Sequence, residues 1–487
     1  MVLDGQQTTQ IAITGPGGIG KSQLELELAY RTQQNYKNCS VFWISAADMD
    51  SFYQACSYVA QKLSIPGWDD ENQDPRKLLQ VHLSRESKGK WLHIYDNADD
   101  ASQGASNQPS QWVTTLLDFI PQSDHGCIIF TTASSNTAEM LVPENTMQLG
   151  KLAAETAAQI LRSHLTNSSV ANEEQEAKHL LGELSCLSLA IKQAAAYIKH
   201  NKISIRRYLE LLSEQKDKTM NPSDKQCGQQ LQYQTADNPV ALTSLISLAQ
   251  VSRHDTTAAS CLFFMACIDR KDVLLQLLLA TPSSPIKTIV DLLNTYAIII
   301  KRPASSAVEL HRLVHLAIRN HLQRQGRLSQ WNQEAIAILA EKFPSASHEN
   351  RSKWRRLLPL AKYALANSDS TISLAVKYAI ALYEDGHFNE AEKLDVQVME
   401  TSKTKLRADH PSTLTSMANL AFTWKGQGRL KDALDLMKGC CFFRTRKLGP
   451  EHPDTISSMV SSRVWQQEQD SQRVRNDIHS NIRISQQ

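Results

Sequence analysis

The sequence has no excess of either charge sign and no long apolar run. Its 487 residues include 52 lysines and arginines against 50 aspartates and glutamates, a formal net charge of +2. Proteins that bind nucleic acid usually carry a concentrated positive charge, so we expect no nucleic-acid partner. No apolar run approaches the roughly 20 residues of a membrane span, and the opening residues MVLDGQQ do not have the form of a signal peptide. We therefore expect no membrane association and a cytoplasmic location.

Cysteine is also sparse. The nine cysteines are scattered without C-x-x-C spacing, and Cys440 and Cys441 are adjacent. Paired spacing is what a zinc site or a disulfide framework would require. The pattern therefore indicates reduced thiols, in agreement with a cytoplasmic protein.

The chain does contain a glycine-rich loop, ITGPGGIGKSQ, at residues 13–23. Gly15, Gly20, Lys21 and Ser22 fit the pattern G-x-x-x-x-G-K-[ST] without a mismatch. The apolar residues before the loop predict a strand, and the residues from Lys21 onward predict a helix. In such a loop, backbone N–H groups and the helix N-terminus surround phosphates, the lysine reaches the β- and γ-phosphates, and the hydroxyl binds Mg²⁺. The alternative interpretation is an ordinary glycine-rich turn, but the flanking strand and helix favour a phosphate-binding loop.

A second element follows at WLHIYDNADD, residues 91–100, where an apolar run ends in Asp96. A carboxylate at the end of a neighbouring strand is the usual partner of Mg²⁺ in such sites. The next residue is Asn97, where many fast P-loop ATPases have a glutamate that orients water. An amide cannot accept the proton, so we expect at most a slow ATPase. Asp99 or Asp100 could substitute, or both could belong to a solvated loop.

Strand and helix patterns alternate through the first third of the chain. Apolar or β-branched runs predict strands at residues 10–14, 41–44, 91–95, 127–132 and 147–149. Alternation of this kind predicts a parallel α/β sheet with the nucleotide at the carboxyl ends of the strands. We assign residues 1–150 to this P-loop domain.

The rest of the chain is predicted to be mostly helical. We assign residues 151–215 to a helical domain, including helical stretches at 152–165 and 173–200, and residues 215–237 to a polar linker. Residues 240–325 predict helices, a small hairpin near 296–306 and a last helix, the succession of a winged-helix-like domain. Residues 330–366 are assigned to a helical linker, and 466–487 to a divergent or disordered tail.

Residues 370–465 repeat with an offset of 42 residues. ADHPSTLTSM at position 408 matches PEHPDTISSM at position 450, and Gly386 falls on Gly428. Each unit predicts two amphipathic helices joined at the glycine, and such units bury their apolar faces by stacking into an α-solenoid. A plain helical bundle would not repeat in register. The visible array is short, because stable arrays usually need roughly three or more units.

Together these features resemble the STAND class of signal-transduction ATPases. More narrowly, the chain is similar to fungal NB-ARC proteins with kinesin-light-chain-type tetratricopeptide repeats, relatives of the NOD-like receptors. The segments that carry the resemblance are GPGGIGKSQL, YDNADD, FTTAS, LSLAIKQAAAYI, LHRLVHLAIRNHL and the 42-residue repeats. Of these, only the phosphate loop is specific by itself.

The resemblance implies roles for particular residues. Lys21 and Asp96 would be the catalytic residues, with Ser22 and Asp96 holding Mg²⁺. His311 would reach the β-phosphate of ADP and hold the resting state, although a single histidine is otherwise most often an ordinary helix-end residue. The residues that would contact ADP or ATP are Gly15, Gly17, Gly18, Ile19, Gly20, Lys21, Ser22, Gln23 and His311.

Two positions depart from the family pattern. Ala133 stands where the family usually has an arginine that senses the γ-phosphate, and Ser188 stands where it has a proline near the adenine. Without the arginine, ADP binding could survive while ATP-driven opening and hydrolysis weaken. The phosphate loop also lies close to the first residue, so we expect no N-terminal effector domain in this chain. It would be a truncated or degenerate member, or one that signals through a separate partner.

Three functions remain open from the sequence. The first is a nucleotide-controlled switch, in which exchange of ADP for ATP releases the domains and allows self-association. Its repeats would sense a ligand, bind a protein or peptide partner, or cover the switch. The second is an interaction scaffold in which the nucleotide is structural, favoured by Ala133, Ser188 and the missing effector domain. The third is a metabolic ATPase or kinase, against which Asn97 and the lack of a recognisable substrate site argue.

Overall fold

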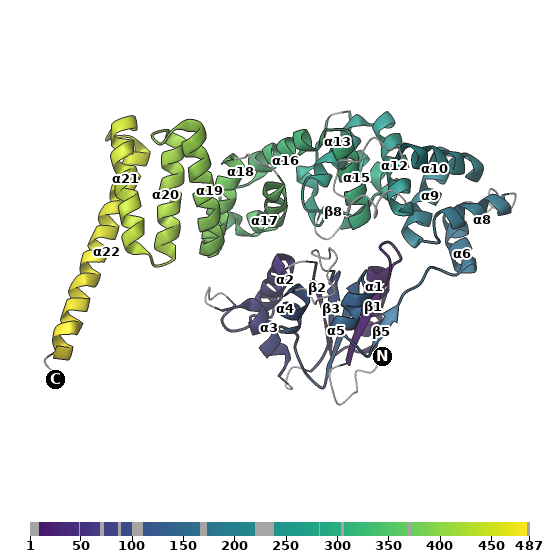
Figure 1. Cartoon of the computed structure of the whole chain (residues 1–487), viewed down its shortest axis with the longest axis horizontal. Coiled ribbons are helices and arrows are strands. Elements are labelled where there is room, and N and C mark those ends of the chain that lie inside the picture. Colours follow the sequence, from purple (N-terminus) through teal and green to yellow (C-terminus); the bar gives the residue numbers. More distant parts are fainter. Residues whose placement is uncertain are drawn as a thin grey trace. The chain divides into compact units, whose positions relative to one another are not determined.

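The computed structural model describes ten segments of the chain, which Figure 1 shows as ribbons. The segments are residues 9–47, 49–68, 73–85, 89–99, 111–165, 173–219, 238–281, 283–302, 306–367 and 372–484. The chain divides into two compact units. Unit 1 comprises Met1–Thr256, Lys287–Ile300 and His311–Ile318, and unit 2 comprises Thr257–Ile286, Lys301–Leu310 and Arg319–Gln487.

Unit 1 begins with a five-stranded sheet in the order β2-β3-β4-β1-β5. Every neighbouring pair is parallel, which confirms the predicted sheet. Each expected strand is found within about two residues of its predicted bounds. The strands are β1 (Thr9–Thr14), β2 (Cys39–Ser45), β3 (Lys90–Asp96), β4 (Gly126–Thr132) and β5 (Thr146–Gln148).

Both faces of this sheet are buried. On β3, Trp91 and Tyr95 belong to one apolar cluster, whereas Leu92 and Ile94 belong to a second cluster with Ile13. Alternate residues of a strand point to opposite faces. A strand covered on both sides is therefore a nearly continuous apolar run, which is why β3 could be read from the sequence.

Within the described segments, five helices accompany the strands. They are α1 (Lys21–Asn35), α2 (Met49–Lys62), α3 (Pro75–Leu83), α4 (Gln111–Leu117) and α5 (Ser135–Leu141). The sequence predicted α1 and α2 but not the three shorter helices. α3 has a clear start signal, because the Asp74 carboxylate accepts the Arg76 N–H and Pro75 stands in the first turn.

A helical region continues unit 1. Its helices are α6 (Ala154–His164), α8 (Glu174–Glu183), α9 (Ser188–Asn201), α10 (Ile205–Thr219) and α12 (Pro239–His254). The stretch expected at 173–200 is two helices, because Ser185 and Cys186 both adopt a φ of 51° and end α8. α10 runs into the expected linker 215–237, of which residues 220–237 lie outside the described segments.

The next elements follow the order expected of a winged helix. They are α13 (Thr256–Ala266), β6 (Val273–Leu274), η3 (Leu275–Leu277), α14 (Ile286–Thr295), β7 (Ile299–Arg302), β8 (Ala307–Leu310) and α15 (Arg312–Arg324). The strands form a sheet in the order β6-β8-β7. β6 was not predicted, because a strand of only two residues has no recognisable pattern. Of the expected hairpin turn, residues 303–305 lie outside the described segments.

Unit 2 ends in paired helices. They are α16 (Leu328–Lys342), η5 (His348–Asn350), α17 (Arg351–Ala366), α18 (Ile372–Glu384), α19 (Phe388–Leu406), α20 (Pro411–Gly426), α21 (Leu430–Leu448) and α22 (Pro453–Ile484). Figure 1 shows α18 to α22 as a row of neighbouring helices. The predicted turns are at Gly386 and Gly428, with φ of 83° and 79°.

The last helix differs from the expectation for the chain end. α22 continues without a break from Pro453 to Ile484, so the boundary placed at residue 465 does not end a helix. No glycine or proline follows Pro453 in the sequence to stop the helix. In the described part of the chain, no helix has the length and apolar character needed to cross a membrane.

Candidate nucleotide-binding site

The glycine-rich loop connects β1 to α1, as predicted. Gly18 and Gly20 have φ of 81° and 114°, a backbone region that side chains with a Cβ rarely adopt. Gly20 is the N-cap of α1 and, being glycine, offers no side-chain acceptor to the first turn. The N–H groups of the first turn and the positive end of the helix dipole are therefore oriented for an anion.

Apolar side chains from two later segments pack on this loop. A Cβ on Gly17 would lie 3.1 Å from Leu313 Cδ1, and a Cβ on Gly18 would lie 3.0 Å from Val240 Cγ2. At Gly18 both the close approach of Val240 and the positive φ favour glycine, whereas at Gly17 only the close approach of Leu313 does. The loop is covered by α12 and by the start of α15, both within unit 1.

Lys21 lies at the start of α1 and folds over the loop. Its Nζ donates to the carbonyl oxygens of Gly15 at 2.6 Å and Pro16 at 3.3 Å. Burial lowers the pKa of Lys21, while the negative charges of Asp99 and Asp96 act in the opposite direction. An anionic ligand in the loop would reinforce the charged form of this lysine.

Ser22 and Asp96 meet across the loop, as the prediction of a magnesium site required. The Ser22 hydroxyl donates to Asp96 Oδ1 at 2.9 Å, and the Thr131 hydroxyl donates to the same oxygen at 3.1 Å. A hydroxyl and a carboxylate are the hard oxygen ligands that Mg²⁺ prefers. These residues therefore fit Mg²⁺, and a bound ion, together with Lys21, would neutralise phosphate charge.

The loop after Asp96 is an ordered polar cluster. Asp99 Oδ1 accepts hydrogen bonds from the Thr132 hydroxyl at 2.8 Å and from the Ala133 N–H at 2.5 Å. Asp99 Oδ2 lies 2.7 Å from Arg312 Nη1, and Asn97 Oδ1 lies 3.3 Å from the same nitrogen. Asp99 therefore does not belong to a solvated loop, while Asp100 lies outside the described residues.

Ser188 lies on the phosphate loop. Its hydroxyl donates to the carbonyl oxygens of Gly18 at 3.1 Å and Ile19 at 3.3 Å. These hydrogen bonds hold the N-terminus of α9 against the loop. A proline at this position could not make them.

His311 immediately precedes α15. Its Nδ1 accepts the N–H of Leu313 at 3.2 Å, which assigns the proton of the neutral ring to Nε2. Since Leu313 packs on Gly17, the start of α15 lies at the phosphate loop. Binding of a phosphate by His311 stays a prediction.

Sequence reasoning missed two residues of this site, Glu25 and Arg312. Glu25 is fully buried on α1, and neither carboxyl oxygen has a hydrogen-bond partner in the described structure. Burial, and then the negative charge of Asp96, raise the pKa of Glu25 to about 9. Its spacing of four residues places it on the same face of α1 as Lys21. No pattern in the sequence indicates that this face is buried.

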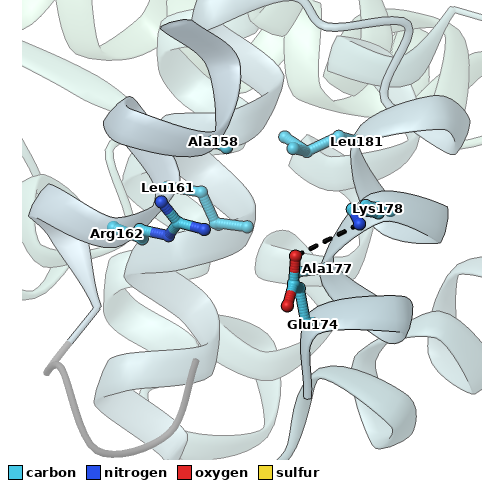
Figure 2. A pocket seen from close by; sticks show the side chains of 7 residues that line it. All are labelled: Ala158, Leu161, Arg162, Glu174, Ala177, Lys178 and Leu181. Carbon is cyan, nitrogen blue, oxygen red and sulfur yellow. Dashed lines mark ion pairs between the residues drawn. The ribbon is translucent and has the colours of Figure 1, made fainter. Parts of the chain in front are cut away.

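A small cavity in the helical region does not compete as the nucleotide site. Figure 2 shows it between α6 and α8, where Arg162, Glu174 and Lys178 surround the apolar side chains of Leu161 and Leu181. Its volume of about 40 Å³ suits a few water molecules. Glu174 and Lys178 form an exposed ion pair of 3.1 Å at helical i,i+4 spacing, which indicates an ordinary surface feature.

Comparison with known proteins gives one extensive sequence match. A nucleotide-binding leucine-rich repeat (NLR)-like protein of Hyaloscypha variabilis is 32% identical over 429 residues, which cover 84% of this chain and 43% of the relative. The chain thus spans less than half the length of this relative. The family model of the tetratricopeptide repeat matches residues 378–412 and 413–454, which confirms the predicted repeats.

Two solved structures are weakly similar to this chain. A STAND protein with a tetratricopeptide repeat sensor from Pyrococcus horikoshii has 13% identity and a TM-score of 0.43, and covers 93% of this chain and 68% of its own. A Walker-type ATPase of Pyrococcus abyssi has 12% identity and a TM-score of 0.30, and covers 64% and 91%. At these scores the fold assignment rests on the strand order and helix succession described above.

Proposed function

The chain is a homologue of NLR-like proteins that carries tetratricopeptide repeats, and from this premise we propose that it is a nucleotide-controlled signalling switch. ADP with Mg²⁺ would occupy the glycine-rich loop in the resting state. Exchange for ATP would release the segments that cover the loop and permit self-association. Coupling of this kind requires that the two nucleotides make different contacts with the two states.

One observation carries this proposal: three segments distant in sequence pack on the same loop. Ser188 donates to its carbonyl oxygens, Val240 packs on Gly18, and Leu313 packs on Gly17. A nucleotide bound in the loop would therefore contact, or lie beside, the starts of α9, α12 and α15. The number of phosphates would therefore directly affect how strongly these helices are bound to the loop.

The roles of the site residues follow from their contacts. Lys21 would bind the β- and γ-phosphates, Ser22 and Asp96 would hold Mg²⁺, and Gly15–Gln23 would supply backbone donors. His311, at the start of α15, would reach the β-phosphate from the covering side. Because Asn97 occupies the position after Asp96, hydrolysis would be slow and nucleotide exchange would set the state of the switch.

The repeats would provide the second binding surface. α18 to α21 form the two repeats that the family model matches. Stacked helix pairs of this type create extended surfaces that other proteins use for binding. We propose that a protein or peptide partner binds here and that its binding is coupled to the nucleotide state.

The first experiment is to denature the purified protein and identify the nucleotide it releases. We expect stoichiometric ADP from the wild type, none from Lys21→Ala, and ADP again from Lys151→Ala, which removes an exposed lysine outside the loop. Light scattering with ADP and with a non-hydrolysable ATP analogue then measures the predicted change in mass.

The alternative function is an interaction scaffold with a structural nucleotide. Ala133 favours it, because this position supplies no cation for the γ-phosphate. Stoichiometric ADP with a mass that never changes with nucleotide would support the scaffold. Absence of bound nucleotide, with no thermal shift on adding ADP or ATP, would contradict the switch. Multiple turnover would instead indicate a true ATPase.

A further inference from the structure

The residue that directly follows β4 carries no charge. Ala133 follows the strand directly, and its side chain is a methyl group. The γ-phosphate that distinguishes ATP from ADP brings additional negative charge into a site that already contains Asp96 and Asp99. Unless a further cation joins Lys21 and Mg²⁺, like-charge repulsion would disfavour ATP relative to ADP.

Asp99 brings a cation to this position from elsewhere in the chain. Its Oδ1 is fixed by the Thr132 hydroxyl and the Ala133 N–H, so the carboxylate is attached to the end of β4. Its Oδ2 pairs with Arg312 Nη1 at 2.7 Å. The side chain of Asp99 is only 13% exposed, which indicates a defined position for the pair.

Arg312 has the features of a group that can change partners. It is the first residue of α15 and follows His311 directly. Its side chain is 51% exposed, and the nitrogen that meets Asp99 also meets Asn97 Oδ1 at 3.3 Å. A guanidinium can bind phosphate as well as carboxylate in forked geometry.

The charge of Arg312 reaches the phosphate loop. Its positive charge acts to lower the pKa of Lys21, whereas Asp99, Asp96 and Glu25 act to raise it. Arg312 and Lys21 therefore belong to one electrostatic cluster with Asp96 and Asp99.

We propose that Arg312 is the residue by which this chain distinguishes ATP from ADP, supplying from α15 the cation that Ala133 does not provide. With a diphosphate bound, Arg312 stays paired with Asp99. A γ-phosphate competes with Asp99 for the guanidinium, and this exchange of partners detaches the first turn of α15 from the end of β4. The inference rests on the proposed function, since it assigns the residue that reads the nucleotide at the same site.

The test compares affinities for two fluorescent probes in the presence of Mg²⁺: methylanthraniloyl-ADP and the same derivative of a non-hydrolysable ATP analogue. We expect Arg312→Gln to weaken binding of the triphosphate about tenfold and that of ADP less than about twofold. Arg324→Gln, which removes an exposed arginine from the other end of α15, should change neither. The double variant Arg312→Gln/Ala133→Arg should recover triphosphate binding.

Two further results keep the assignment falsifiable. If Arg312→Gln unfolds, Arg312→Lys retains the charge but loses the fork, and we expect a smaller, still triphosphate-selective loss. If Arg312→Gln weakened the binding of both probes equally, so that the ratio of their dissociation constants stayed at the wild-type value, the assignment would be overturned and the nucleotide switch would remain intact. A wild type that binds ADP in neither this assay nor the release experiment would overturn the proposed function, and the assignment with it.

Discussion

At the scale of single residues, two buried ionisable groups in the sheet domain are distinctive. Glu25 on α1 and His93 on β3 are 0% and 1% exposed, and none of their polar atoms has a hydrogen-bond partner in the described structure. Burying such a group without a partner is costly unless it is neutral. Each should therefore bind or release a proton when the protein unfolds, in opposite pH ranges.

Glu25 should weaken the fold as the pH rises. Its pKa is raised from 4.5 to about 9 by burial and by Asp96 on β3, opposed by the nearby Thr131 hydroxyl and by Lys21 on its own helix. The folded state keeps a proton that the unfolded state loses, so stability is full below pH 4.5 and falls as the pH approaches about 9. We expect Glu25→Gln to remove this part of the pH dependence. Thermal unfolding across the window measures it, and an unchanged slope would contradict the assignment.

His93 should lower the stability of the fold at acidic pH. Its ring packs edge-on against Phe42, Trp91 and Tyr95, and burial lowers its pKa from 6.5 to about 3. The unfolded state gains a proton that the folded state excludes, so stability falls as the pH drops from 6.5 towards 3.

We expect His93→Leu to unfold at a lower pH than the wild type, by acid titration followed with circular dichroism. His125→Leu replaces an exposed histidine of unit 1 and should follow the wild-type curve. A wild-type acid midpoint in both variants would show that His93 does not limit acid stability.

Some residues of the nucleotide site were predicted from the sequence and others were not. Asp96 was identified because it ends an apolar strand, and Ser22 because its spacing from the glycines is fixed. Arg312 and Asp99 were not identified as a pair, because their contact joins positions far apart in sequence. Pattern and spacing describe neighbours along the chain, so contacts set by tertiary packing are not visible in them.

At the scale of elements, the repeats offer a direct comparison of two glycines. Gly428 ends the turn between α20 and α21 with a φ of 79°, whereas Gly439 lies inside α21. A Cβ at either position would meet no atom within 4 Å. Any difference between alanine substitutions therefore comes from the backbone.

We expect Gly428→Ala to lower stability by about 1 kcal/mol, because alanine is strained at positive φ. Gly439→Ala should raise it by about 0.5–1 kcal/mol, because alanine is the better helix former. Denaturant unfolding of the full chain measures both. If both substitutions changed the free energy of unfolding in the same direction, packing and not backbone conformation would determine their effect on stability.

Elements differed in how well the sequence predicted them. The parallel strands and the repeats were predicted because their apolar patterns are long or recur in register. α3, α4 and α5 were missed, being only seven to nine residues long, and β6 is shorter still. The extent of α22 was missed because its polar composition does not show the apolar periodicity on which the prediction relied.

At the scale of the whole molecule, the two units should respond differently to nucleotide. The phosphate loop and all the segments that pack on it belong to unit 1, whereas α18 to α22 belong to unit 2. A ligand present at a hundred times its dissociation constant stabilises the state it binds by about 2.7 kcal/mol.

Hydrogen exchange with mass spectrometry should therefore show ADP slowing exchange in β1, α1 and the start of α15. Exchange in α20 and α21 should change little, and Lys21→Ala should abolish the effect. Equal protection of the repeats would show that the two units unfold as one.

The division into units also constrains the order in which the protein can fold during synthesis. The polypeptide passes from one unit to the other at residues 256, 286, 300, 310 and 318. The sheet and its glycine-rich loop are synthesised before any residue of unit 2. Leu313, which covers Gly17, is synthesised only after two segments of unit 2, Thr257–Ile286 and Lys301–Leu310. A nascent chain therefore leaves the Gly17 side of the phosphate loop without the cover of Leu313 until that residue has emerged, although Ser188 and Val240 are already present. We expect a nucleotide to enter the loop most easily during that interval.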